Sequence, residues 1–445
     1  MRRRAASTAM AAAVAMMGAV GLTGRATAAD LEQVYRDALA NDAVLAAARG
    51  ARDAGLEKQP QGRALLLPSI SVTGNTTWND ATLRHLNPEV SRGYNSNGWQ
   101  AQLTQPLFRW QNWVQYQQGA LQATYAEAQF QIARQDTILR AAQAYFDVLA
   151  AQDTLAAANA LHEANTQQLA LAKKSFEVGT VTITDVHEAQ SRADLSSAQM
   201  IAAESDLAIK RHALLVLTNK EPDALKGLRK GVALSRPEPA DMQAWVSAAE
   251  GGNLSVQAAQ IADEIAGREV ERNRAGHLPT VDVVASYGNV ATANSLANFI
   301  NTDIRSTVLS LQVNVPVFQG GAVSSRVREA AALREKAAAD LDNARRTSAQ
   351  NARQAYLGVN SGLAQVRAFE AAQISSASAL DANRLGYDVG VRINIDVLNA
   401  QSQLYDTRQK LARARYDTLM AQLRLKAAAG ALDEADIQAI NGLLD

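Results

Sequence analysis

Val178-Gly179-Thr180-Val181-Thr182 interrupts a tract that otherwise has the composition of one very long helix. This tract runs from Leu107 to Glu221, a stretch of 115 residues without Pro. A second Pro-free tract of 129 residues, from Val317 to Asp445, is interrupted in the same way at Val389-Gly390-Val391-Arg392. Pro inside a helix costs about 3 kcal/mol, and a Gly commonly ends one. The two tracts therefore predict two helical pairs, each with a break at a Gly.

The first helix of each pair is predicted to be much longer than a helix of a globular domain. A helix from about Gln111 to Phe176 spans on the order of 100 Å. In the second tract, small and apolar residues recur at steps of three and four, which is typical of coiled-coil packing. These residues are Val323, Val327, Ala330, Leu333, Ala337, Leu341 and Ala344. Since no compact domain buries such a helix, we expect an elongated, mostly α-helical fold.

The chain is an internal duplication, because a shift of 211 residues superposes its halves. Equivalent stretches are Leu67-Pro68 and Leu278-Pro279, Gln143-Ala144-Tyr145 and Gln354-Ala355-Tyr356, Val178-Gly179 and Val389-Gly390, and Asp185-Val186 and Asp396-Val397. We divide the chain into a signal peptide (1–28), a first repeat (29–220), a crossover linker (221–240) and a second repeat (241–445). Each repeat is expected to contain a helix, a β-hairpin, a long helix and a further helix.

The N-terminus has the features of a secretory signal. Arg2, Arg3 and Arg4 precede an apolar run from Ala9 to Leu22, and Ala26-Thr27-Ala28 supplies small residues for cleavage after Ala28. The alternative is an uncleaved anchor, although the run is short for a membrane span. An exported chain of this size without Cys indicates a bacterial envelope protein, and the missing Cys excludes disulfides and an N-terminal lipid anchor. The balance of 44 basic and 44 acidic residues argues against nucleic acid as a partner.

Each repeat holds two stretches with a period of two, which predicts strands. One face of each strand is polar but uncharged, and the other is apolar. Each stretch is about ten or eleven residues long, the length of a tilted transmembrane strand. We expect polar hairpin loops at residues 81–97 and 291–305. The side chains predicted to face lipid are Val281, Val283, Leu309, Leu311 and Val313.

Four strands are too few to close a membrane barrel, since single-chain barrels begin at about eight. Unpaired backbone in lipid is too costly for an open sheet. If the strands span the membrane, several chains must share one barrel. Two chains would give a side-chain-filled interior, and three would leave a passage. A single-chain, autotransporter-like barrel is therefore excluded.

The order strand, long helix, Gly break and helix, present twice, resembles the TolC family of outer-membrane efflux channels. The resemblance covers the whole mature chain and includes Leu103-Thr104-Gln105-Pro106-Leu107-Phe108, Phe176-Glu177-Val178-Gly179, Gly276-His277-Leu278-Pro279-Thr280 and Gly386-Tyr387-Asp388-Val389-Gly390. It implies a homotrimer with a twelve-stranded barrel in outer-membrane lipid, continued by a twelve-helix α-barrel in the periplasm. It also implies a periplasmic adaptor protein and an inner-membrane ABC or RND-type transporter as partners, in tripartite efflux or type I secretion.

The resemblance also assigns residues to a gate at the periplasmic mouth. Tyr387 and Arg392 match positions that link the inner helix pair to the outer pair, and Thr184 and Asp185 match their partners. Asp396 matches an acidic residue of the narrowest ring. The neighbouring acidic position of the family is Asn399 here, so the ring would carry three carboxylates in a trimer instead of six.

Simpler readings of these residues remain open. Asp185 and Asp396 can stabilise helix N-termini through the helix dipole, and Arg392 can be a solvated charge. The residues show no metal-ligand spacing, phosphate-binding loop or catalytic Ser-His-Asp pattern, so we expect no cofactor and no enzymatic activity. The alternative function is a soluble periplasmic coiled-coil adaptor or scaffold, in which the apolar strand faces would pack into a protein core.

Overall fold

The computed structural model describes residues 28–84, 89–221, 224–229, 231–294 and 300–445. The predicted signal peptide lies outside the described residues except for Ala28. The elements of the first half are α1 Leu31–Asn41, α2 Ala43–Leu56, α3 Lys58–Ala64, β1 Ser69–Leu83, β2 Val90–Phe108, α4 Trp110–Glu177 and α5 Ile183–Thr218. Those of the second half are α6 Met242–Gly252, α7 Leu254–Arg274, the 3₁₀ turn η1 Ala275–His277, β3 Thr280–Thr292, β4 Thr302–Asn314, α8 Ala322–Asp388, α9 Asn394–Ala428 and α10 Glu434–Asn441.

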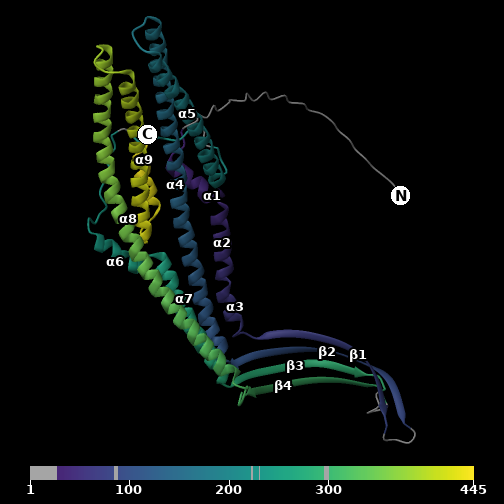
Figure 1. Cartoon of the computed structure of the whole chain (residues 1–445). Coiled ribbons are helices and arrows are strands. Elements are labelled where there is room, and N and C mark those ends of the chain that lie inside the picture. The colour runs from purple at the N-terminus through teal and green to yellow at the C-terminus, as the bar shows by residue number, and fades with distance from the viewer. Residues whose placement is uncertain (1–27, 85–88, 222–223, 230, 295–299) are drawn as a thin grey trace, which may run out of the picture.

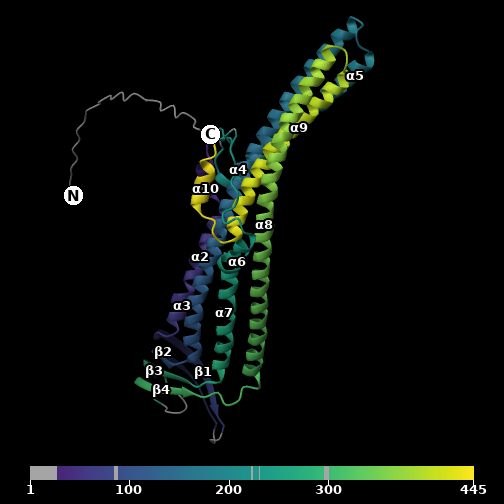
Figure 2. The same ribbon diagram turned by 90° about the vertical axis from the view of Figure 1, so that its left-hand side faces the viewer.

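Two very long helices, α4 with 68 residues and α8 with 67, run the length of the molecule. The bounds of α4 differ by one residue at each end from those predicted. Figures 1 and 2 show both helices running from the sheet at one end to turns at the other. α5 packs against α4 and α9 against α8, while α7 lies against both long helices. None of the helices in the described part of the chain is both long enough and apolar enough to cross a membrane.

The largest hydrophobic core lies near the middle of the long axis, where the chain is thickest. Tyr145 and Phe146 of α4 are almost fully buried there, with their rings edge to face at a centroid distance of 5.8 Å. Leu419 and Leu423 of α9, and residues of α1, α5 and α10, complete the cluster. Burying large side chains contributes about 1.5–3 kcal/mol each, so this cluster joins the repeats.

The crossover between the repeats bonds to Ala29 and to Asp445. Ala29 donates its N–H to the carbonyl oxygen of Ala224 at 2.8 Å, and Asp445 donates to Gly227 at 2.9 Å. The buried Tyr145 donates its hydroxyl to the carbonyl oxygen of Lys226 at 2.7 Å. The described linker residues 224–229 therefore run across the core and bond to both repeats.

The four strands form one antiparallel sheet in the order β1-β2-β3-β4. Strand pairing joins the repeats directly, since β2 of the first pairs with β3 of the second. The sheet meets the helices at the end opposite the two Gly turns (Figure 1). β1 and β4 are the two edges.

The strands are longer than predicted, with 15, 19, 13 and 13 residues from β1 to β4. Much of the predicted loop at 81–97 is therefore strand: β1 continues to Leu83 and β2 begins at Val90. The prediction failed because polar residues, among them Thr82, Ser91 and Ser96, interrupt any apolar alternation here. They pair across the hairpin instead, since Asn79 and Thr82 donate to the hydroxyls of Ser96 and Ser91, each at 3.1 Å. The predicted loop at 291–305 is likewise shortened at both ends.

Candidate functional site: the helical turns and the sheet

The turn of each helical pair places a Gly in the left-handed region. Gly179 has φ +77° and Gly390 has φ +76°, a conformation that L side chains rarely adopt. A Cβ built on either Gly would meet nothing within 4 Å, so the backbone conformation alone requires Gly. Both turns lie at the same end of the molecule in Figure 1. The residues assigned to a gate surround these turns.

Asp185 forms the first-turn cap of α5. The Thr182 hydroxyl accepts from the Asp185 N–H at 3.3 Å, and the Asp185 carboxylate accepts from the Thr182 N–H at 2.9 Å. This reciprocal capping box supplies the simpler role weighed for Asp185. Thr184 is exposed beside it. The cap holds the Asp185 carboxylate at the start of α5.

Tyr387, in the last turn of α8, lies near this carboxylate. Burial raises the pKa of Tyr387, and the charges of Asp185 and Asp388 add to the rise, while a hydrogen bond with Ser175 of α4 opposes it. These neighbours put Tyr387 between the two helical pairs. The Asp185 carboxylate is therefore close enough to act electrostatically on the Tyr387 hydroxyl.

Arg392 and Asp396 form an ion pair within one helix turn. The guanidinium Nη1 lies 3.6 Å from the Asp396 carboxylate, with the two side chains 58% and 33% exposed. The stem of Arg392 covers Gly386, where a Cβ would approach its Cγ at 2.7 Å. In this structure the guanidinium is therefore paired along its own helical pair, whereas the resemblance implies a partner in the other pair.

Asn399 is bonded across the two helical pairs. Its Oδ1 accepts from Arg192 Nη2 of α5 at 2.9 Å. Sequence reasoning missed Arg192, although a signal was available: it follows Asp185 by seven residues and so lies on the same helix face. A second missed residue, Asn394 in the first turn of α9, is 1% exposed.

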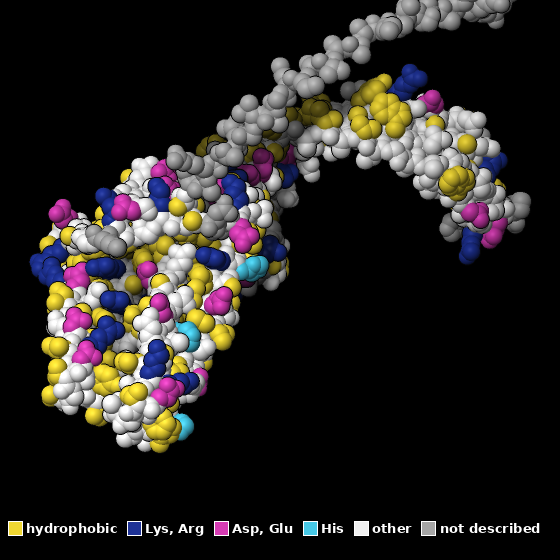
Figure 3. Space-filling model, turned by 90° about the horizontal axis from the view of Figure 1, so that it is seen from above, with side chains coloured by type: hydrophobic (Ala, Val, Ile, Leu, Met, Phe, Trp, Pro, Cys, Tyr) yellow, Lys and Arg dark blue, Asp and Glu magenta, His cyan; other side chains and the backbone are white. Residues whose placement is uncertain are grey.

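The five side chains predicted to face lipid share one face of the sheet. Val281 pairs with Val313, and Val283 with Leu311, in the β3–β4 register. Leu309, Leu311 and Val313 are 76%, 63% and 57% exposed, so no protein core covers them among the described residues. Figure 3 shows the sheet projecting from the helical body, with hydrophobic side chains on the surface in view. The apolar face is therefore available to an outside partner.

The opposite face of the sheet is mostly polar and carries few charges. Ser71, Gln102 and Ser286 form one row across β1, β2 and β3. The carboxylate of Asp282 also lies on this face, at the junction with the helices, and it is bound by Arg109. A sheet with one apolar and one neutral polar face suits a wall between lipid and water.

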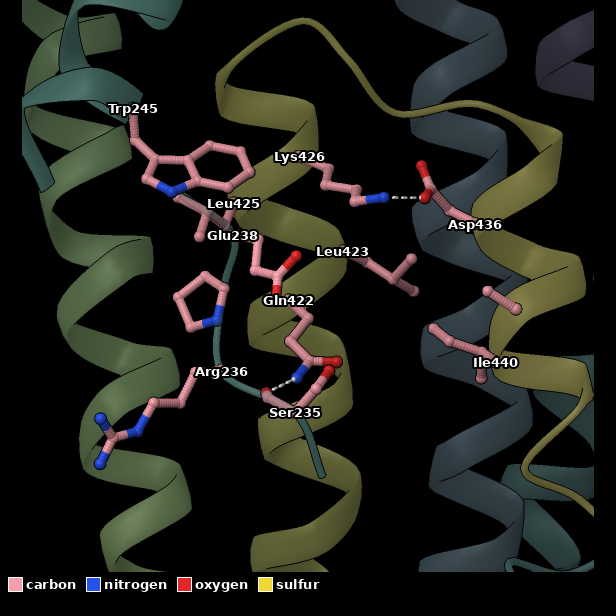
Figure 4. Close-up of a pocket in the computed structure, with 12 residues that line it drawn as sticks. Ser235, Arg236, Glu238, Trp245, Gln422, Leu423, Leu425, Lys426, Asp436 and Ile440 are labelled. Atoms are coloured by element: carbon pink, nitrogen blue, oxygen red, sulfur yellow. Dashed lines mark hydrogen bonds and ion pairs between the residues drawn. The ribbon is translucent and has the colours of Figure 1, made fainter. Parts of the chain in front are cut away.

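A cavity of about 380 Å³ lies where the crossover meets α9 and α10 (Figure 4). Its polar groups bond to one another: Lys426 pairs with Asp436, and Gln422 donates to the carbonyl oxygen of Ser235 at 2.8 Å. Trp245 donates its indole N–H to Pro239 at 2.8 Å. The bonds of Gln422 and Trp245 fasten the crossover to α9 and α6, the Lys426–Asp436 pair joins α9 to α10, and we assign the cavity no ligand.

Comparison with known proteins agrees with this geometry. The model of the family "Outer membrane efflux protein" matches the chain twice, over residues 34–220 and 245–431. Outer membrane protein TolC of Vibrio cholerae is 34% identical over 94% of this chain and 95% of its own length. Proteases secretion protein PrtF of Dickeya chrysanthemi is 35% identical over 93% of this chain and 91% of its own.

Solved structures show the same fold at low sequence identity. The Campylobacter jejuni outer membrane channel CmeC superposes with a TM-score of 0.79 at 16% identity, covering 93% of this chain and 90% of that one. The Vibrio cholerae outer membrane protein VceC gives 0.77 at 18% identity, covering 90% of this chain and 96% of that one.

Fold, sheet and relatives together define an outer-membrane channel that extends into the periplasm and serves as an exit duct for efflux and secretion. The chain belongs to the outer membrane efflux protein family, and its relatives within it include TolC. The family and these relatives are transport proteins rather than enzymes, and the assignment decides against the periplasmic adaptor.

Proposed function

We propose that three copies of this chain form one duct through the outer membrane, in which twelve strands close a barrel and the helices continue it as a periplasmic α-barrel. The observation that carries this proposal is the exposed apolar face of a four-stranded sheet whose two edges, β1 and β4, have no strand partner among the described residues. Lipid requires every backbone group to be paired, so the edges need strands from other copies. A twelve-stranded barrel also leaves an open passage, which eight strands do not.

The mature chain in this proposal consists of the repeats 29–220 and 241–445 joined by the linker 221–240, after removal of residues 1–28. Each repeat contributes one hairpin to the barrel wall and one pair of helices to the tunnel. The neutral polar sheet face lines the passage, and the apolar face contacts lipid. Val281, Val283, Leu309, Leu311 and Val313 are then lipid contacts.

The turn-proximal ends of the helices form the periplasmic mouth. Tyr387 and Asp185 link the two helical pairs, with Thr184 and Arg392 beside them, and Asp396 lines the narrowest ring together with Asn399. The links are a few hydrogen bonds worth about 0.5–3 kcal/mol each, so a partner that binds one arrangement better can shift the mouth between states. A periplasmic adaptor and an inner-membrane ABC or RND-type transporter are the partners we propose for that step.

The test is conductance in planar bilayers. The purified protein should give discrete, low-conductance channels, and the pair of changes Tyr387→Phe and Arg392→Ser should raise the conductance several-fold by releasing the mouth. A preparation that inserts but conducts nothing contradicts the duct. Normal conductance that the two changes leave unaltered removes these residues from the gate and keeps the duct.

A further inference from the structure

The buried side-chain amide of Asn394 lies between α4, α5 and α9, close to the two Gly turns. Gln168 of α4 donates its Nε2 to Asn394 Oδ1 at 2.6 Å. Asn394 in turn donates its Nδ2 to the main-chain carbonyl oxygen of Asp185 in α5 at 3.4 Å. Since Asn394 begins α9 and is 1% exposed, it joins α9 to both helices of the other pair from inside their interface.

The apolar cluster beside Asn394 contains three Ala residues among its five buried members. The cluster consists of Leu169, Ala172, Ala189, Ala193 and Leu398, with Val186 and Ile395 at its margin. Apolar contacts are non-directional, so they set the position of α9 along α4 and α5 less strictly than a directional hydrogen bond. A buried amide does not, because any slide leaves its donor and acceptor without partners in an apolar setting. A single buried Asn is known to fix register in coiled coils for this reason.

A second hydrogen bond to a side-chain amide lies at the exposed rim of the same interface. Arg192 of α5 donates to Asn399 of α9 at 2.9 Å, in an exposed position. Its guanidinium reaches across from the helix that also supplies the carbonyl bound by Asn394. Two independent polar contacts therefore hold α9 at one position on the α4–α5 pair.

These four residues differ from those at the equivalent positions of the other repeat. Under the 211-residue shift, Asn394 corresponds to Ile183 and Gln168 to Ala379. Arg192 corresponds to Gln403, and Asn399 to Glu188. Neighbouring stretches such as Val178-Gly179 are identical in both halves. The four side chains are therefore not part of the duplicated pattern, and they join α9 to the α4–α5 pair.

We propose that Asn394 is the positioning residue of the periplasmic mouth: with Gln168 it sets the register of α9 on the α4–α5 pair, and Arg192 with Asn399 supports that register at the rim. The effect of Asn394 on opening of the mouth rests on the proposed function. Its effect on the register of α9 against α4 and α5 does not. Asn394 acts here through the helices and touches no cargo.

The test measures the separation of the two turns directly. The chain has no Cys, so Val178→Cys and Val391→Cys, at side chains 75% and 78% exposed, accept spin labels at defined sites. Labelled chains are mixed with an excess of unlabelled ones, so that pulsed electron–electron distances report within one chain. The starting protein should give one narrow distribution.

Asn394→Asp places a carboxylate against the Asp185 carbonyl and should lengthen and broaden the distribution. Asn383→Asp adds the same charge on α8, where the Asn383 amide donates an exposed hydrogen bond to Ala379 of the same helix, and should leave the distribution narrow. The double change Gln168→Leu and Asn394→Leu keeps the interface apolar and uncharged, and should broaden the distribution without a loss of helix. Arg192→Gln should broaden it less.

The outcomes separate the two proposals. Distances in Asn394→Asp and in the double variant that match the starting protein overturn the positioning role, even if the channel conducts normally. Shifted distances in a protein whose wild type conducts nothing support the positioning role and contradict the duct. Shifted distances together with raised conductance in Asn394→Asp support both.

Discussion

Arg109 donates two hydrogen bonds to the carboxylate of Asp282, at 2.7 and 2.6 Å, and so ties the start of α4 to β3. The two residues come from different repeats and meet where the sheet passes into the helices. The Asp282 side chain is 7% exposed, whereas Arg109 is 40% exposed. This fork-like pair fixes the angle between sheet and helix in a way that a single bond would not.

Asp282→Asn should therefore destabilise the junction. The change leaves the Arg109 guanidinium without its counter-charge in a partly buried site, at a cost of about 1–3 kcal/mol after allowing for the exposure of Arg109. The apparent melting temperature in detergent should fall by several degrees. Asp303→Asn, at an exposed acid of β4, is the control and should melt like the starting protein. Equal melting of both variants would show that the pair contributes nothing.

Neighbouring residues of β4 test which sheet face meets lipid. Leu311 is on the apolar face and Gln312 on the opposite face. Leu311→Arg should cost up to about 2–4 kcal/mol of membrane stability, because a charge that faces lipid is poorly solvated. Gln312→Arg should cost much less. Folding yield in lipid vesicles measures both, and a larger penalty for Gln312→Arg would reverse the assignment of the faces.

The carboxylate ring at the mouth is testable by cation block. Asp396→Asn should weaken block by a trivalent cation in planar bilayers, since three of the ring's charges disappear from the proposed trimer. Asn399→Asp should strengthen block by a smaller amount, because Arg192, which donates to Asn399 at 2.9 Å, would partly neutralise the new carboxylate. Block that neither change alters would place the cation site elsewhere in the duct.

Asp42 is expected to make the folding stability of the chain fall at low pH. Burial raises the pKa of this carboxyl, but hydrogen bonds from Arg140 and from main-chain N–H groups outweigh burial and hold the pKa below its ordinary value. Because the folded pKa is depressed, the stabilisation is complete above about pH 4 and is lost as the pH falls through the folded pKa. The melting temperature should therefore drop below about pH 4.

Asp42→Asn should lower stability by about 1–3 kcal/mol at pH 7 and flatten this acid decline. Asp136→Asn is the matched control, since Asp136 pairs with the same Arg140 but is 59% exposed. It should keep both the stability and the decline. An acid profile of Asp42→Asn that is parallel to that of the starting protein would contradict the role of Asp42.

The sequence predicted most of the architecture because its signals are long or local. The long helix α4 is predicted by the absence of Pro over more than a hundred residues. Each turn is predicted by a Gly, which has a positive φ in the structure. The ends of the strands were missed because pairs such as Asn79 with Ser96 are polar on both sides. Arg192 and Asn394 were missed for another reason: their partners are more than 200 residues away, and periodicity within one helix does not tell which face of another helix it meets.

The number of chains in the particle tests the central claim most directly. The mature protein is extracted from the outer membrane in mild detergent, and native mass spectrometry of the detergent-stripped particle counts its chains. The account predicts three chains, because only then do the strand edges close around an open passage. A particle with one chain, stable and folded in detergent, would contradict it.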